Sequence, residues 1–288
     1  MRRVEPRAAG RPAARGAAGG AVGAFVVLCF VGVALAAPWL APHDPVAIAT
    51  QRAFESPSAE FWLGTDQLGR CLFSRLVFGA RWSVGLVVPL ALAVATLGLV
   101  VGVAAGAFGG WVDAVLMRCV DVVLAFPGLI LVLAVVGMLG GGLAAVLAAL
   151  AGAWAARNAR VVRGIVLSVR DQPYVEAARA LGVGRLRIVT RHLLPAALPS
   201  VAVLATLEMG ELLLALAGLS FLGLGAQPPT PEWGAMLNDA RAHALTVPQL
   251  MLWPGLAISL LVIGFNLLGD DLRDRLDPVV APAIKASA

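Results

Sequence analysis

The sequence has few of the residues that a water-exposed enzyme needs. Only 14% of its 288 residues are charged, against about 25% in an ordinary globular domain, and 6% are aromatic, with a single tyrosine. Three cysteines, Cys29, Cys71 and Cys119, form no CxxC pair, so neither a disulfide framework nor a zinc site is predicted.

Motifs for nucleotide and metal chemistry are also lacking. No G-x-x-x-x-G-K-[ST] loop occurs, so we expect this chain not to hydrolyse ATP itself. The three histidines, His43, His192 and His243, stand far apart, which argues against a metal or acid–base site. The net charge of +5 could suit nucleic acid, but the arginines lie beside apolar runs without interleaved aromatics, so no nucleic-acid partner is expected.

Apolar residues occur instead in long runs. They make up 60% of the chain, and the mean hydropathy of +0.88 places the protein in a lipid bilayer. A helix needs about 20 apolar residues to cross the hydrocarbon layer. The runs predict an all-α polytopic membrane protein with six transmembrane helices, near residues 21–41, 83–108, 114–139, 142–163, 197–224 and 249–269.

The N-terminal region has two interpretations. Residues 1–20 are rich in Arg, Ala, Gly and Pro without an apolar period, which predicts a disordered basic tail. With the apolar run that follows and small residues near Ala36, the region also resembles a cleavable signal peptide. Because the run continues past Pro38 to Trp39, a residue typical of membrane interfaces, we expect an uncleaved first helix over 21–41.

The basic residues orient the predicted spans, because Lys and Arg favour the cytoplasmic side of a membrane. A cytoplasmic N-terminus puts both termini and segment 164–196 inside, and segments 42–81 and 226–249 outside. With Arg118 and the helix end of Arg157 and Arg160 assigned to the cytoplasmic side, all but five of the 22 Lys and Arg residues lie inside. The five outside are Arg52, Arg70, Arg75, Arg81 and Arg241. The inverted topology would reverse this bias.

Segment 174–195 is a polar, Arg-rich island between two apolar runs. Its first half, from Glu176, consists of good helix formers, and Gly182 stands where a glycine would end a helix. A second helical run begins at Arg185, and we expect Pro195 to end it because proline cannot continue a helix. Two short, basic helices joined at a glycine suit a docking element.

The same segment is similar to the cytoplasmic loop signature of the permease subunits of ABC importers. The matching residues are Glu176, Ala177, Ala178, Gly182, Leu194 and Pro195, and His192 departs from the pattern, which usually has Ile there. Three further blocks, beginning at Leu63, Ser220 and Phe265, resemble the dipeptide, oligopeptide and nickel subfamily of these permeases. Within that subfamily they resemble the second of the two permease subunits.

The resemblance implies a type I ABC importer permease fold, with its core over 82–270, a coupling loop at 171–195 and a cytoplasmic tail at 271–288. It implies a heterodimer with a related permease, two ATPase subunits and an extracytoplasmic solute-binding protein. The chain would lie in the inner membrane and translocate di- or oligopeptides by alternating access. It would bind no cofactor, since ATP and Mg²⁺ belong to the ATPases. A nickel-type importer is the alternative within the family.

The resemblance gives the loop, including Arg185, the role of ATPase contact. Glu176 would lie near a helix N-terminus, where a carboxylate is stabilised by about 0.3–1 kcal/mol, so a structural role competes with direct contact. The arginines of the loop could meet acidic groups of the ATPase or anionic lipid headgroups, and the sequence leaves both open.

Two carboxylates, Glu208 and Glu211, lie inside the fifth predicted span and share one helix face. A carboxylate in hydrocarbon costs at least about 2.5–3.5 kcal/mol, so both should face the bundle interior or a watery cavity. They could line the translocation path and meet the amino terminus of a peptide, or lie protonated against the partner permease. A proton-coupled secondary transporter is a rival of another class, but no internal repeat is seen, and a structural membrane subunit is a third.

The polar segment 226–249 joins the last two spans. We expect a short helix from Glu232 to Ala244 that lies in the membrane interface and is anchored there by Trp233. With segment 42–81 it should form the platform that meets the solute-binding protein, and Asp239 and Arg241 are candidate contacts. The alternative is a connector held only by lipid.

Overall fold

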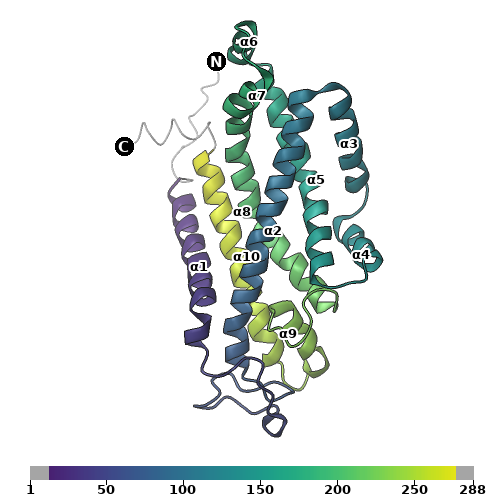
Figure 1. Cartoon of the computed structure of the whole chain (residues 1–288). Coiled ribbons are helices and arrows are strands. Elements are labelled where there is room, and N and C mark those ends of the chain that lie inside the picture. Colours follow the sequence, from purple (N-terminus) through teal and green to yellow (C-terminus); the bar gives the residue numbers. More distant parts are fainter. Residues whose placement is uncertain (1–12, 277–288) are drawn as a thin grey trace, which may run out of the picture.

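The computed structural model describes residues 13–276, and helices account for most of this range (Figure 1). The α-helices are α1 (Ala13–Leu40), α2 (Leu72–Phe108), α3 (Gly110–Leu124), α4 (Gly128–Met138), α5 (Leu143–Arg170), α6 (Pro173–Ala180), α7 (Arg185–Ile188), α8 (Leu194–Phe221), α9 (Trp233–Ala240) and α10 (Gln249–Leu276). Shorter elements are the 3-10 helices η1 (Thr50–Arg52) and η3 (Arg241–His243) and the π-helical turn η2 (Val189–Leu193). Within the described range the β structure amounts to one isolated bridge, Thr65 to Cys71, so the expected all-α fold is confirmed.

Four stretches of helix are long and apolar enough to cross a membrane: 19–40 of α1, the whole of α2, the continuous helix 185–221 that ends in α8, and α10. The pair α3 and α4 passes the same test together but is bent by 94° at its break. The remaining candidate, α5, runs along the bundle beside α2 (Figure 1), but polar residues in its middle keep it out of this apolar group. The six expected spans therefore correspond to four apolar helices, one bent pair and one polar helix.

The span expected over 114–139 is broken in the structure. The chain leaves the helix after Leu124 and re-enters it at Gly128, with Pro127 as the residue before α4. Proline donates no backbone hydrogen bond and disfavours helical backbone in the residue before it, here Phe126. These two properties of proline explain the break at this point, although hydropathy alone favours one unbroken helix.

The expected element boundaries also shift at both ends of the chain and before the second span. Helix α1 begins at Ala13, so residues 13–20 are helical rather than a tail, and 1–12 lie outside the described residues. At the other end α10 continues to Leu276, and 277–288 of the expected tail lie outside the described residues. Helix α2 begins at Leu72, inside the expected segment 42–81.

The bundle is built around α2, which packs against α1, α5 and α8. Gly98, Gly102 and Gly106 of α2 face α5, and a Cβ at Gly102 would lie only 2.6 Å from the carbonyl oxygen of Ala159. Small residues at this spacing let two helix backbones approach closely, which is how association is achieved without a hydrophobic driving force in lipid.

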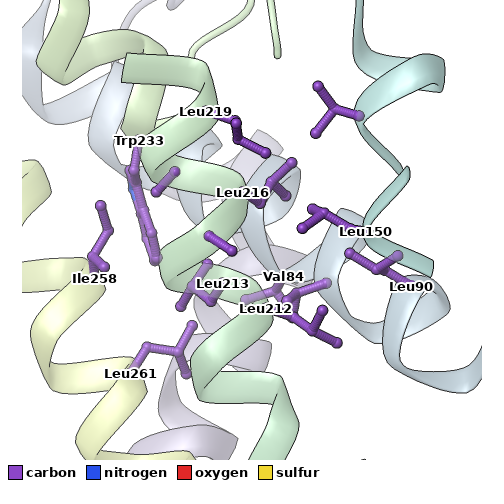
Figure 2. Close-up of a cluster of buried hydrophobic side chains, with 14 of the residues drawn as sticks. Val84, Leu90, Leu150, Leu212, Leu213, Leu216, Leu219, Trp233, Ile258 and Leu261 are labelled. Carbon is purple, nitrogen blue, oxygen red and sulfur yellow. The ribbon is translucent and has the colours of Figure 1, made fainter. Parts of the chain in front are cut away.

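Buried side chains of α2, α5, α8 and α10 meet in one apolar cluster. Figure 2 shows the leucines of α8 directed at residues of the surrounding helices, with the ring of Trp233 at one side. The labelled members are Val84, Leu90, Leu150, Leu212, Leu213, Leu216, Leu219, Trp233, Ile258 and Leu261. This cluster fixes α8 relative to its neighbours, and with it the polar residues that α8 carries.

The two ends of the bundle hold different segments. Helices α6 and α7 lie at the end where α1 begins and α10 ends, while segment 42–71 and α9 lie at the opposite end (Figure 1). This is the partition that the predicted spans imply, with segment 164–196 on one side and segments 42–81 and 226–249 on the other.

Candidate functional site

The coupling loop 171–195 projects from one end of the bundle (Figure 1). Helix α6 begins with Pro173 in its first turn and ends in a Schellman motif centred on Gly182, whose φ is +76°. In this motif the amide of Gly182 donates to the carbonyl of Arg179, and that of Val183 donates to the carbonyl of Ala178, each at 3.0 Å. The predicted helix stop at Gly182 is confirmed.

The expected helix stop at Pro195 is wrong. Helix α7 continues through the π-helical turn η2 into α8, and Pro195 lies in the first turn of α8. Proline removes one hydrogen bond from the continuous helix, and the π-helical turn directly before it is the local irregularity at which the helix accommodates this loss. The second half of the loop is therefore continuous with the apolar helix α8.

The loop exposes its signature residues and its tip. Glu176 and Ala177 are exposed, Ala178 is half-buried, and Arg185 is exposed. At the turn between the helices Leu181 is 84% and Leu186 75% exposed.

Apolar contacts hold the loop against the bundle. Val175, Ile188 and Leu193 are buried in a cluster with Val103 of α2 and Val166 of α5. The loop is thus attached firmly on one side and offers an apolar tip with basic flanks on the other.

A charge cluster lies between α5 and α8 in the middle of the bundle. One amino group of Arg157, Nη2, lies 2.7 Å from Oε2 of Glu211 and 3.1 Å from Oε1 of Glu208. Asn158 donates from Nδ2 to Oε2 of Glu208 at 2.8 Å, and Trp154 donates from Nε1 to Oε2 of Glu211 at 3.3 Å. Arg157 thus bridges the two carboxylates that the sequence singled out.

The two carboxylates differ in exposure. Glu208 is buried, whereas the side chains of Glu211 and Arg157 are 55% and 48% exposed. A pocket of about 490 Å³ lies beside Glu211 and Trp154 and is otherwise lined by apolar residues of α4 and α8, including Leu129 and Leu214. Two carboxylates and one guanidinium leave the cluster with a net negative charge when all are ionised.

Sequence reasoning missed the partners in this cluster, because it assigned Arg157 to a cytoplasmic helix end. The structure places Arg157 midway along α5. The sequence could have predicted this pairing, because a charge inside a membrane helix requires a partner. Arg157 and Asn158 lie inside the fourth expected span, and they could have been paired with Glu208 and Glu211 of the fifth.

The expected interfacial anchoring by Trp233 is wrong. Its side chain is buried, and Nε1 donates to the carbonyl of Leu76 at 3.1 Å. The indole lies against Gly79 of α2, where a Cβ would come within 2.4 Å of the ring, and makes an edge-to-face contact with Phe30 at 5.6 Å. Trp233 therefore anchors α9 to the bundle and not to the membrane surface.

Asp239 likewise makes contacts inside this chain. Its Oδ2 lies 3.1 Å from Nη2 of Arg70 and 3.2 Å from Nη2 of Arg75, and Asp66 pairs with Arg70 at 2.6 Å. This outer ion network, Asp66, Arg70, Arg75 and Asp239, joins segment 42–71, α2 and α9. Of the three docking candidates, Arg241 alone is exposed.

Comparison with known proteins agrees with this architecture. A family model described as "Binding-protein-dependent transport system inner membrane component" matches residues 98–282. The chain belongs to this family. It is 48% identical over 256 residues to the nickel transport system permease protein NikC of Escherichia coli (strain K12), covering 88% of this chain and 92% of the relative. It is 44% identical over 253 residues to the glutathione transport system permease protein GsiD of Pectobacterium atrosepticum, covering 88% and 84%.

Membership in this family confirms the resemblance to ABC importer permeases of the peptide and nickel group. The protein is a permease subunit of an inner-membrane importer and not an enzyme, since ATP hydrolysis belongs to a separate subunit. Permeases of this family work with ATPases and binding proteins. The named relatives belong to nickel and glutathione transport systems, so they do not single out a peptide substrate.

Proposed function

We propose that this chain forms one side of a translocation path that passes the charge cluster of Arg157, Glu208 and Glu211, and that the substrate is a di- or oligopeptide with a free amino terminus. The observation that carries the proposal is the exposed carboxylate of Glu211 in the middle of the bundle. A charged side chain exposed to lipid in the middle of the bundle would be unfavourable, so we expect Glu211 to face a water-filled path.

The cluster suits the cationic end of a substrate. Glu208 is buried and bonded to Arg157 and Asn158, whereas Glu211, which also pairs with Arg157, keeps a half-exposed carboxylate beside the pocket. An ammonium group can pair with this carboxylate, and Trp154 offers an aromatic ring close by. The leucines of the pocket then face the first side chain of the peptide.

A nickel-type importer is the second candidate, favoured by the identity to NikC. Residues 13–276 contain no group of three or more His, Cys, Asp and Glu side chains that could hold a metal ion. A nickel complex with a positive charge would meet the same carboxylate, Glu211, on its way through.

The assembly follows the family pattern in this proposal. A related permease completes the path, two ATPases bind the coupling loops, and a solute-binding protein docks on segment 42–71 and α9. The exposed Leu181 and Leu186 enter a groove of the ATPase, while Glu176 and Arg185 flank them. Both termini lie in the cytoplasm, and the chain itself binds no cofactor.

Uptake into proteoliposomes tests the proposal, using the complete complex with its binding protein, a labelled dipeptide and radioactive Ni²⁺. Glu211→Gln keeps the shape of the side chain but removes its charge. Hydrogen bonds to charged groups are worth about 1.5–3 kcal/mol, so peptide uptake should fall by about tenfold or more. Asp274→Asn, which removes an exposed carboxylate at the far end of α10, is the matched control and should transport normally.

Each outcome bears on a different part of the proposal. Nickel uptake without peptide uptake would overturn the peptide assignment, and a decrease in Glu211→Gln would then still support the path. Unchanged uptake in Glu211→Gln would overturn the path itself.

A further inference from the structure

A second pocket, of about 430 Å³, lies where the coupling loop meets the bundle. Three arginines from three helices line it: Arg170 at the end of α5, Arg179 in the last turn of α6 and Arg185 at the start of α7. We call it the arginine pocket. Asp171 is the one acidic residue in its lining.

The positive charge of this pocket is poorly balanced by the residues around it. Arg170 uses Nη1 to donate to the carbonyl of Gly106 at 2.9 Å, and its contact with the exposed Asp171 is long, at 3.4 Å. Arg179 donates to the carbonyl of Arg170 at 3.3 Å. Among residues 13–276, Arg185 has neither an ion pair nor a side-chain hydrogen bond. Three guanidinium groups therefore face one weakly held carboxylate.

Clustering like charges is unfavourable unless an anion joins them. Guanidinium groups present a fork of N–H donors that matches the oxygens of a phosphate, and they bind phosphate with two parallel hydrogen bonds. The volume of the pocket exceeds that of a single phosphate and leaves room for a larger group attached to it.

The rest of the lining indicates where such an anion comes from. Ala107 and Phe108, the last residues of α2, form an apolar side of the pocket, and Phe108 is exposed. We place this side of the pocket at the level of the lipid headgroups because the apolar helix α2 ends here. On the cytoplasmic side those headgroups include anionic phospholipids, which attract clusters of arginine.

We propose that the arginine pocket binds a phosphate group, supplied by an anionic phospholipid or by free inorganic phosphate, and that the bound anion ties α6 and α7 to the ends of α2 and α5. The site is separate from the charge cluster of the translocation path and does not depend on the identity of the substrate. The bound anion would stabilise the position of the coupling loop, because Arg179 and Arg185 belong to that loop. It would also affect α8, because α7 continues into α8.

Binding is measured on the purified complete complex in detergent, with phosphatidylglycerol in mixed micelles as one probe and millimolar inorganic phosphate as the other. Arg179→Gln and Arg185→Gln remove one charge each from the pocket. Arg187→Gln is the matched control, because Arg187 is an exposed arginine of the same loop that does not line the pocket. Arg170 is left unchanged because it also holds the end of α2.

We expect phosphatidylglycerol affinity to fall about fivefold or more in Arg179→Gln and in Arg185→Gln, the factor for one basic residue at an anionic lipid surface, and to change little in Arg187→Gln. Binding of the lipid but not of phosphate identifies the headgroup as the ligand, and competition by phosphate identifies the free anion. Equal decreases in all three variants would show general surface attraction and overturn the proposal. The proposal is also overturned if neither probe binds, or if Arg185→Gln weakens only the binding of the ATPases and leaves lipid and phosphate binding unchanged.

Discussion

Replacing Asp239 by Asn should loosen the outer end of the bundle. Arg70 and Arg75 are each only 2% exposed, and Asp239 and Asp66 are their acidic partners. With both carboxylates the outer ion network is neutral, and without Asp239 it holds an unbalanced buried charge. Arg75 would be left with weaker compensation for its charge than Arg70. Its remaining ion pair with Asp66 is long, at 3.5 Å, and its Nη1 has no hydrogen-bond partner among the described residues.

Removing one member of a buried ion pair costs about 3–5 kcal/mol, because the other charge is left without compensation. Asp66 still neutralises part of the charge, so we expect a loss near the lower limit, about 3 kcal/mol. The loss should be local, because the network joins segment 42–71 to α9 and does not reach the middle of the bundle.

Hydrogen exchange of the purified complex measures this effect. Protection should fall by about two orders of magnitude in segment 42–71 and α9, and remain in α5 and α8. Arg241→Gln, an exposed change one residue beyond α9, is the control and should cost less than about 0.5 kcal/mol. If Asp239→Asn is as protected as Arg241→Gln, the network does not hold the outer segment and the reasoning fails.

Further predictions concern the loop, the outer surface and the topology. Gly182→Leu places a side chain at φ +76°, which costs about 1–2 kcal/mol, so it should disturb the Schellman motif and uncouple ATP hydrolysis from uptake; normal uptake would remove the motif from the mechanism. Hydrogen bonds from Arg52 lower the pKa of the Glu60 carboxyl. The pairing therefore stabilises segment 42–71 at pH values above the ordinary pKa of glutamate, and this stabilisation is lost as the pH falls through the lowered pKa. Protection factors there should therefore fall in acid, and Arg52→Gln should remove this dependence; an unchanged dependence in the variant contradicts the assignment. Arg241→Glu should weaken association with the binding protein, most at low salt, because exposed charges are screened beyond about 10 Å at 0.1 M; full association would place docking elsewhere. Cys71 is buried and should resist labelling. A cysteine introduced at Arg241 should react only from the outside, and one introduced at Arg185 only from the cytoplasm; labelling from the opposite sides would show that the topology is inverted.

The sequence by itself determined the class of the protein, most of its helices and the coupling loop. These depend on near neighbours along the chain: apolar runs of sufficient length, and a glycine after a stretch of helix formers, as at Gly182. Local rules failed where backbone context changes the meaning of a residue. Pro195 was expected to end a helix, but the helix continues past it after a π-helical turn. Pro127, in contrast, breaks a run that hydropathy alone predicts as one span.

The tertiary structure decided which polar residues are buried together. The sequence places Arg70 and Arg75 on the outer side of the membrane without showing their partners. In the structure both are buried, and Asp239, 169 residues after Arg70, pairs with both of them. Glu208 likewise finds Arg157, 51 residues before it. The free energy of a charge depends on the groups within a few ångströms of it, and those are chosen by the packing of helices far apart in the chain. The sequence could therefore show that Glu208 and Glu211 need partners, whereas the packing of α5 against α8 showed which partners they have and left Glu211 exposed.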